Sequence, residues 1–383
     1  MKKIALLIMI AIVSLSSCTN EELTDSALNK TESQNEYKPV VFGTYIENTV
    51  SSRAINNLTT SLSGKDGFGV FAFNTYESDI KTISPNFMYN QKVASTNKGD
   101  SWNYSPVKYW PTSSSSTENK NSFFAYAPYI DSNVNTEGII DITSNSTLGA
   151  PKLSFKNSTN VENTIDLLWA VSKENGKALK DITSLNTNGE VNFNFRHALA
   201  KLSLNVKGVF NSNSNENIAD GNKITIESIN ISGSFPSNGT LNLDNEIAYT
   251  PQWENTSGET TFNISNQQIA ESLRDGGSSK STDSISGVTN IATNLLANTS
   301  DGKECYLTFI PTTGDLTISL TYWVTTKDSK LAEGYFRIKN SAKKTISNMT
   351  LVAGKNYSIN VIIGMSGVQF DSNVDNWETV ITE

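Results

Sequence analysis

The segment VNFNFRHALAKLSLNV, residues 191–206, is the most informative part of the sequence about the fold. Its apolar side chains occupy odd positions in the first half and even positions in the second: Val191, Phe193 and Phe195, then Leu202, Leu204 and Val206. Alternation with a period of two is the pattern of a β-strand that buries one face. Because the phase changes across RHALA, we expect a bulge, a bend or a switch between sheets there.

Short apolar strings of the same kind recur along the chain, as in VVFGTYI (40–46), FGVFAF (68–73), SFFAYAP (122–128) and IDLLWAV (165–171). Only residues 266–277 and 289–298 have a pattern that suggests a short helix. Many short strands between turns rich in Gly, Asn and Ser predict an all-β fold built from sandwiches. We place a domain boundary after LNTNGE, which gives sandwiches at residues 39–190 and 191–383.

The front of the chain has the pattern of a lipoprotein signal. Lys2 and Lys3 precede an apolar run of residues 4–13, which is too short to cross a bilayer as a helix. LSSC at residues 15–18 resembles a bacterial lipobox, in which the cysteine thiol takes up a diacylglycerol and the preceding peptide is cut. We therefore expect a signal peptide at residues 1–17, a lipidated Cys18 and a polar tether at residues 18–38. The alternatives are an ordinary signal peptide and an uncleaved anchor.

Composition excludes several classes of function. The 383 residues include 30 Lys and Arg against 38 Asp and Glu, and the resulting net charge of −8 argues against nucleic acid as a partner. One histidine, His197, leaves no histidine-based metal cluster. Cys305, the only cysteine after Cys18, lies in the apolar string CYLTFIP, which predicts a buried, inert thiol and no intramolecular disulfide. We expect no cofactor, no metal and no enzymatic activity.

Three local patterns have both a functional and a structural interpretation. His197 has Asp166 and Ser203 as candidate partners, but no nucleophile motif surrounds any serine, so we expect a structural histidine. DSNVDNWE (371–378) has the start of a calcium loop, but it lacks the glycine and the glutamate that such a loop needs, and it predicts a turn. The aromatic residues of WNYSPVKYWP (102–111) either stack on sugar rings or pack under a loop, and we favour packing.

The ordered set FGTYI, SSRAI, GKDGFGVFAF, WNYSPVKYWP, NSFFAYAP, IDLLWA, VNFNFRHALAKL and LVAGKNYSINVII resembles the fimbrillin family, the subunits and accessory proteins of type V pili. The order and approximate spacing match over nearly the whole mature chain. This resemblance implies two tandem transthyretin-like β-sandwich domains with few short helices. It also implies a lipoprotein precursor at the outer membrane, from which an arginine-specific protease removes the N-terminal segment through the first strand. A strand of another subunit then fills the groove.

The residues that match this mechanism lie near the front of the chain. Arg53 is the only arginine in the first 195 residues, and a cut between Arg53 and Ala54 would release VVFGTYI with the anchor. Burial of Val40, Phe42 and Ile46 contributes at most about 5–9 kcal/mol, against roughly 5–15 kcal/mol for a whole domain. Loss of the strand would therefore require a replacement. Alternatively, Arg53 is a structural turn residue that is never cut, and the protein stays anchored through Cys18.

The resemblance implies a structural, tip or accessory subunit of a surface fimbria that contributes to adhesion. Its partners would be other pilin subunits by strand exchange and the outer membrane through the lipid. A second hypothesis is a non-polymerising surface lipoprotein that binds glycan or host ligands. The C-terminal VQFDSNVDNWETVITE either donates a strand, with residues 377–381 able to swap out, or completes its own domain.

Overall fold

The computed structural model divides the chain into two units, Met1–Tyr37 and Lys38–Glu383. The residues that it describes all lie in the second unit: 38–46, 62, 67–75, 78–95, 101–111, 120–131, 135–174, 177–178, 180–184, 189–209, 222–244, 250–275, 287–298, 302, 304–364 and 367–376. No helix among these residues is long and apolar enough to cross a membrane.

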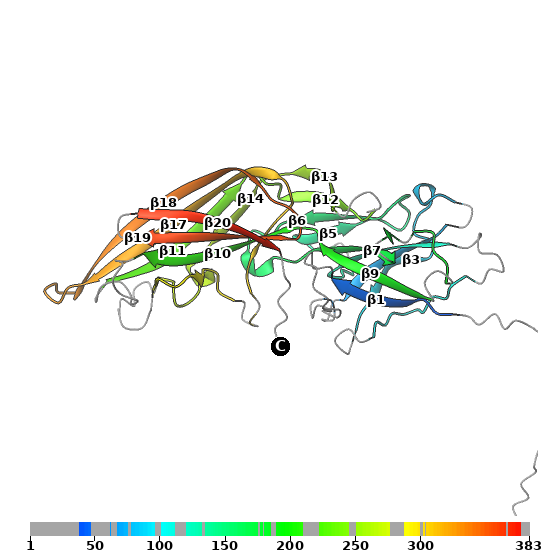
Figure 1. Cartoon of the computed structure of the whole chain (residues 1–383), viewed down its shortest axis with the longest axis horizontal. Helices are drawn as coiled ribbons and strands as arrows, with labels where there is room; N and C mark the ends of the chain where they lie inside the picture. Colours follow the sequence, from blue (N-terminus) through cyan, green and yellow to red (C-terminus); the bar gives the residue numbers. More distant parts are fainter. Residues whose placement is uncertain are drawn as a thin grey trace, which may run out of the picture. The chain divides into compact units, whose positions relative to one another are not determined.

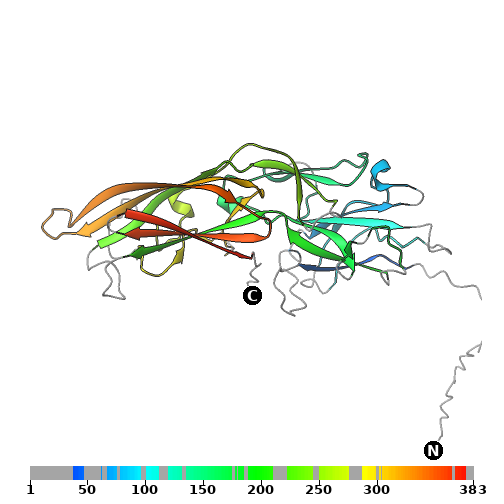
Figure 2. The ribbon, with the colours of Figure 1, turned by 45° about the horizontal axis from the view of Figure 1, so that its top comes forward.

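The described residues form an all-β structure, as the sequence predicts (Figures 1 and 2). Its named helices are single 3-10 turns: η1 (Ile80–Thr82), η2 (Val161–Asn163) and η3 (Asn266–Gln268). The predicted helix at 266–277 is therefore reduced to the turn η3. The predicted helix at 289–298 was wrong, because Leu295 donates its backbone N–H to Leu204 at 2.8 Å and the segment contains strand β15 (Thr293–Asn294).

Two sheets contain the strands of the N-terminal half. The first has the order β1-β9-β7-β4-β2-β3, with β8 beside β7. Its strands are β1 (Val41–Ile46), β2 (Phe68–Asn74), β3 (Met88–Val93), β4 (Asn121–Ala127), β7 (Leu168–Glu174), β8 (Lys177–Ala178) and β9 (Glu190–His197). The second sheet has the order β13-β12-β6-β5. Its strands are β5 (Gly138–Ile142), β6 (Lys152–Lys156), β12 (Asn238–Asn242) and β13 (Gln252–Ser257).

Side chains of these two sheets share one buried cluster, which includes Phe124 of β4 and Phe155 of β6. The other face of the first sheet carries a second, aromatic cluster, which includes Phe42, Phe68 and Phe193. The first sheet is therefore apolar on both faces. This explains why FGVFAF and SFFAYAP are nearly continuous apolar strings rather than alternating ones.

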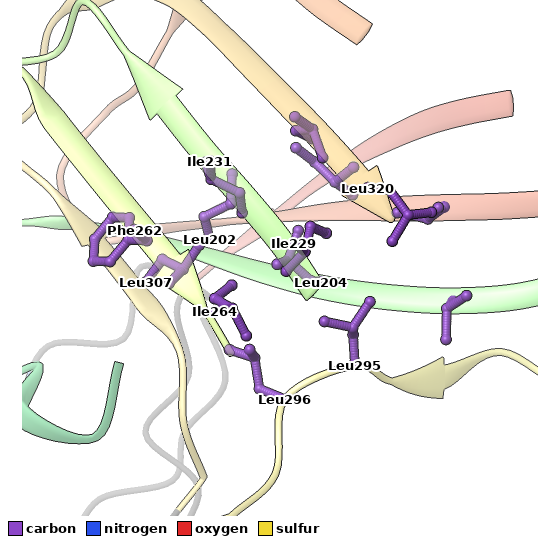
Figure 3. Close-up of a cluster of buried hydrophobic side chains, with 14 of the residues drawn as sticks. Leu202, Leu204, Ile229, Ile231, Phe262, Ile264, Leu295, Leu296, Leu307 and Leu320 are labelled. Carbon is purple, nitrogen blue, oxygen red and sulfur yellow. The ribbon is translucent and has the colours of Figure 1, made fainter. Parts of the chain in front are cut away.

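Two further sheets enclose the C-terminal core. One has the order β15-β10-β19-β20, with β16 beside β10, and the other has the order β14-β11-β17-β18. Side chains from both sheets, among them Leu202, Ile231 and Phe262, point toward one another in a single cluster (Figure 3). The strands are β10 (Ala200–Val209), β11 (Asn222–Gly233), β14 (Thr260–Ile264), β16 (Leu307–Phe309), β17 (Thr313–Lys327), β18 (Tyr335–Thr350), β19 (Lys355–Gly364) and β20 (Gly367–Asn376).

The phase change in residues 191–206 is a switch between sheets. β9 ends at His197 in the first sheet, and β10 begins at Ala200 in the third. Strands from both sides of residue 190 also share sheets, because β9 pairs with β7 and β12 pairs with β6. The boundary at residue 190 stays a prediction, and the chain exchanges strands across it.

Candidate functional site

β1 lies at the edge of the first sheet, beside β9 (Figure 1). The two strands are parallel, with Phe42 opposite Val191 and Ile46 opposite Phe195. Among the described strands, β1 pairs with β9 alone. Its segment alternates as a half-buried strand should, since Val40 and Phe42 are 2% and 3% exposed and Val41 is 47% exposed. The side chain of Ile46 lies outside the described residues.

Phe42 is the main contact of β1 with the core. Its ring stacks on Phe193 of β9 at 5.6 Å between centroids, with an angle of 22° between the planes. It also meets the rings of Phe68 of β2, Phe123 of β4 and Tyr104, at 6.3, 6.2 and 5.3 Å. The edge strand therefore supplies one ring of an aromatic cluster that spans the sheet, and its position is fixed by packing as well as by the ladder to β9.

The residues just before β1 are held from both sides. Val40 donates its N–H to Lys108 O, and Trp110 donates its N–H to Lys38 O, both at 2.9 Å. Pro39 and Tyr109 form the antiparallel bridge between these two bonds. On the other side, Val41 donates to Gly189 O at 3.3 Å. The start of the strand therefore lies in a slot between residues 108–110 and Gly189, whereas the rest of β1 is hydrogen-bonded along one edge only.

The two indoles of WNYSPVKYWP are part of the core, as the packing interpretation predicts. Trp102 and Trp110 are 8% and 3% exposed, and their rings meet Phe68 and Phe123 at 5.0 and 5.8 Å. They therefore present no open ring face to a sugar. Of the aromatic residues in this string, Tyr109 is the most exposed, at 50%.

β20 is a second edge strand and has the same apolar pattern as β1. It pairs antiparallel with β19 and lies at the end of the third sheet. One face carries Val368, Phe370, Ser372 and Val374, and of these Val368 and Phe370 pack against the C-terminal core. The corresponding series in the β1 segment is Val40, Phe42, Thr44 and Ile46. Both segments therefore read aliphatic, phenylalanine, hydroxyl, aliphatic at alternate positions.

The remaining candidates from the sequence have structural surroundings. His197 is buried, and its Nδ1 lies 2.8 Å from Asp166 Oδ1. Cys305 is buried, as predicted. The predicted turn at Asp371–Asp375 was wrong, because this segment is extended in β20 and continues the ladder to β19. The described residues contain no group of three or more His, Cys, Asp or Glu that could hold a metal ion.

Cys18, Arg53 and Ala54 lie outside the described residues, so lipidation and processing stay predictions, as does a role for residues 377–381. Two features of the site were missed from the sequence. The contact of Tyr104 and residues 108–110 with the start of β1 had no local signal, because it joins segments some 65 positions apart. The shared pattern of β1 and β20 is visible in the sequence, but it gains meaning only once both segments are known to be edge strands.

Comparisons with known proteins agree with this architecture. The family model described as fimbrillin-like matches residues 52–377. The fimbrium subunit Fim1C of Phocaeicola vulgatus is 26% identical to this chain over 398 aligned residues, which cover 97% of this chain and 96% of that protein. The crystal structure of a fimbrial protein from Bacteroides vulgatus superposes with a TM-score of 0.61 and 22% identity, and covers 89% of this chain and 100% of that one. This structural similarity to the Bacteroides vulgatus protein, at 22% identity, shows the fold alone.

Proposed function

Since the chain belongs to the fimbrillin-like family, we propose that it is a non-enzymatic structural subunit of a cell-surface fimbria. Its mode of assembly is strand exchange: β1 is removed from one copy, and β20 of another copy takes its place. The observation that carries this proposal is the shared alternation of two edge strands, Val40-x-Phe42-x-Thr44-x-Ile46 and Val368-x-Phe370-x-Ser372-x-Val374.

The position of β1 supports its removal. β1 pairs only with β9 among the described strands, so its release breaks that ladder and the short pairing of residues 38–40 with residues 108–110. The strand carries no charged residue, whereas β18, the edge of the fourth sheet, carries Arg337, Lys339, Lys343 and Lys344. Charged edges discourage pairing with another chain, and an uncharged edge permits it. β1 therefore lacks the charges that protect β18 from pairing with another chain.

The free energy of burial explains why β1 cannot be removed without another strand taking its place. Burial of Val40 and Phe42 contributes about 3–6 kcal/mol at most, a large part of the roughly 5–15 kcal/mol that stabilises a domain. Without β1, the rings of Phe193, Phe68 and Phe123 each lose one aromatic neighbour, and β9 presents unpaired backbone groups. A donated strand with a phenylalanine at the same place restores both interactions.

β20 supports the role of donor. It is also an edge strand, so it leaves the third sheet by breaking only its ladder to β19. If it enters parallel to β9, as β1 does, Phe370 takes the place of Phe42, and Ser372 takes the place of Thr44. The buried residues of β20 then follow one another along β9 in the same order as those of β1. The reverse direction would place Ser372 where Phe42 lies.

Export and processing complete the proposal. Cys18 would carry the lipid that takes the precursor to the outer membrane, and cleavage between Arg53 and Ala54 would free β1 together with that anchor. Copies that keep Cys18 would remain at the membrane. Adhesion would follow from the assembled fibre.

The test is N-terminal sequencing and intact mass of protein recovered from the cell surface, beside an Arg53→Ala variant. We expect a start at Ala54 and denaturant-resistant ladders, and we expect both to be lost in the variant. An Arg53→Lys variant is the matched control, because it keeps the positive charge but removes the arginine that the protease needs. We expect it to behave like Arg53→Ala. A lipidated start at Cys18 and a single monomer band in all three chains would exclude the polymerising subunit and leave a surface binder.

A further inference from the structure

We propose that Tyr104 and Lys108–Trp110 form a strand clamp that fixes the register of whichever strand occupies the β1 position. The occupants are β1 itself and, on the proposed function above, β20 of a second copy. The clamp holds the start of the strand from the side opposite β9. It thus turns one end of an open sheet edge into a slot that accepts a single alignment.

The backbone of the clamp pairs with the residues before β1. Two N–H···O bonds of 2.9 Å, from Val40 to Lys108 O and from Trp110 to Lys38 O, surround the bridge of Pro39 with Tyr109. A shift of the strand by one residue would break both bonds and turn Phe42 from the core to solvent. The clamp and the alternation of the strand therefore select the same register.

Tyr104 connects the clamp to the strand by two different interactions. Its hydroxyl donates to Val40 O at 2.8 Å and accepts from the N–H of Lys108 at 3.3 Å. Its ring lies 5.3 Å from that of Phe42. The Tyr104 hydroxyl is protonated at neutral pH at its ordinary pKa, and burial raises that pKa further. One side chain thus recognises a backbone carbonyl and the aromatic residue two positions later.

The clamp is anchored at both ends to the sandwich, so it stays in place when the strand changes. Asn103 and Ala94 exchange two backbone hydrogen bonds, of 3.0 and 2.9 Å, next to the end of β3. Trp110 is buried and donates its Nε1–H to Gly189 O at 3.0 Å. Neither anchor depends on β1. The slot is therefore preformed for a replacement strand.

The register of a donated β20 follows from these contacts. With Val368 at the position of Val40, Gly367 lies at the position of Pro39 and faces Tyr109. Val368 then donates to Lys108 O, and its carbonyl accepts from Tyr104. Gln369, two residues further along, would not lie opposite Tyr109. The pair Tyr109 and Gly367 is therefore the diagnostic contact between two copies.

The first experiment measures amide hydrogen exchange over residues 38–46 of the intact chain. Tyr104→Phe keeps the ring and removes the hydroxyl, and we expect Val40 to exchange about fivefold faster, the ratio that one typical net hydrogen bond supports. Tyr89→Phe is the matched control, because the hydroxyl of Tyr89 also donates to a carbonyl, Thr143 O, at 3.0 Å and away from β1. Equal exchange of Val40 in wild type and Tyr104→Phe would overturn the clamp.

The second experiment tests the register between copies. Chains with Tyr109→Cys are assembled with chains carrying Gly367→Cys or Gln369→Cys, because directly opposed residues of a ladder come within reach of a disulfide. We expect linked dimers with Gly367→Cys and not with Gln369→Cys, and the opposite result would overturn the register. Fibres without either link would exclude β20 as the donor. A failure to assemble at all would reject both strand exchange and this register. The amide hydrogen exchange of Val40 in the first experiment would still decide whether the clamp holds β1.

Discussion

Phe42 is the side chain on which the candidate site depends most. It is one of two buried residues that the β1 segment is seen to contribute, and four aromatic rings from four other parts of the chain surround it. The alternation of residues 40–46 predicts that Phe42 is buried, because neighbouring side chains of a strand point to opposite faces. Its partners are not predictable in the same way, because Phe68, Phe123 and Phe193 are distant in the sequence.

Substitution of Phe42 tests this packing. We expect Phe42→Ala to lower the free energy of unfolding by about 3–5 kcal/mol, because the ring leaves a cavity among side chains that are themselves buried. Val41→Ala is the control on the same strand, since Val41 is 47% exposed, and should change stability by less than about 0.5 kcal/mol. Urea unfolding gives both values. Equal losses would mean that β1 does not bury the face that carries Phe42.

At the scale of elements, β1 and β20 are alike in position and pattern. Both are edge strands, and both carry a phenylalanine, a hydroxyl and two aliphatic residues on one face. They differ in direction, since β1 is parallel to β9 and β20 is antiparallel to β19. The pattern is readable from the sequence, but the edge position is not, because it depends on which strands remain without a second neighbour.

Exchange of Phe370 with Ser372 tests whether the pattern of β20 matters for assembly. The composition of the strand is unchanged, but the phenylalanine no longer reaches the place of Phe42, so we expect the denaturant-resistant ladders to be lost. The matched control exchanges Gln369 with Asp371 on the opposite, exposed face and should leave the ladders intact. Gel electrophoresis without boiling measures both. Ladders of normal length in the first variant would exclude β20 as the donor.

At the scale of the whole molecule, the N-terminal sandwich, meaning the first two sheets, contains strands from the C-terminal half of the chain. β12 pairs with β6 from Asn238↔Lys156 to Asn242↔Lys152, and Lys152 of β6 forms an ion pair with Glu254 of β13 at 2.6 Å. Leu241 and Leu243 are buried in the cluster that also holds Phe155. A chain that ended near residue 199 would lack these strands and would expose that cluster.

Leu241→Ala tests this dependence. Leu241 is fully buried, so we expect a loss of about 2–5 kcal/mol in the free energy of unfolding and faster amide exchange in β6, although the two strands lie some 85 positions apart. Leu148→Ala is the control, because Leu148 is 61% exposed. Hydrogen exchange read by mass spectrometry resolves the effect on each strand. Unchanged protection of β6 would show that the N-terminal sandwich is stable without the β12–β13 hairpin.

Most of the strands, and the side chains that they bury, can be read from the sequence alone. Alternation is a local property of extended backbone, and it predicted the burial of Phe193 and Leu202 and a change between them. The burial of Cys305 followed from the apolar string CYLTFIP, and the burial of Trp102 is the packing interpretation that we favoured over sugar stacking. The helix expected at 289–298 and the turn expected at 371–375 failed, because their backbones pair with β10 and β19.

Which strands lie side by side is known only from the folded chain. Pairing joins backbone groups that are far apart in the sequence and carry no side-chain signal of their partner, so the order of strands cannot be read from periodicity. The parallel pairing of β1 with β9, the edge position of β20 and the entry of β12 into an N-terminal sheet are all of this kind. The clamp at Tyr104 belongs with them, since it exists only because two distant segments pack side by side.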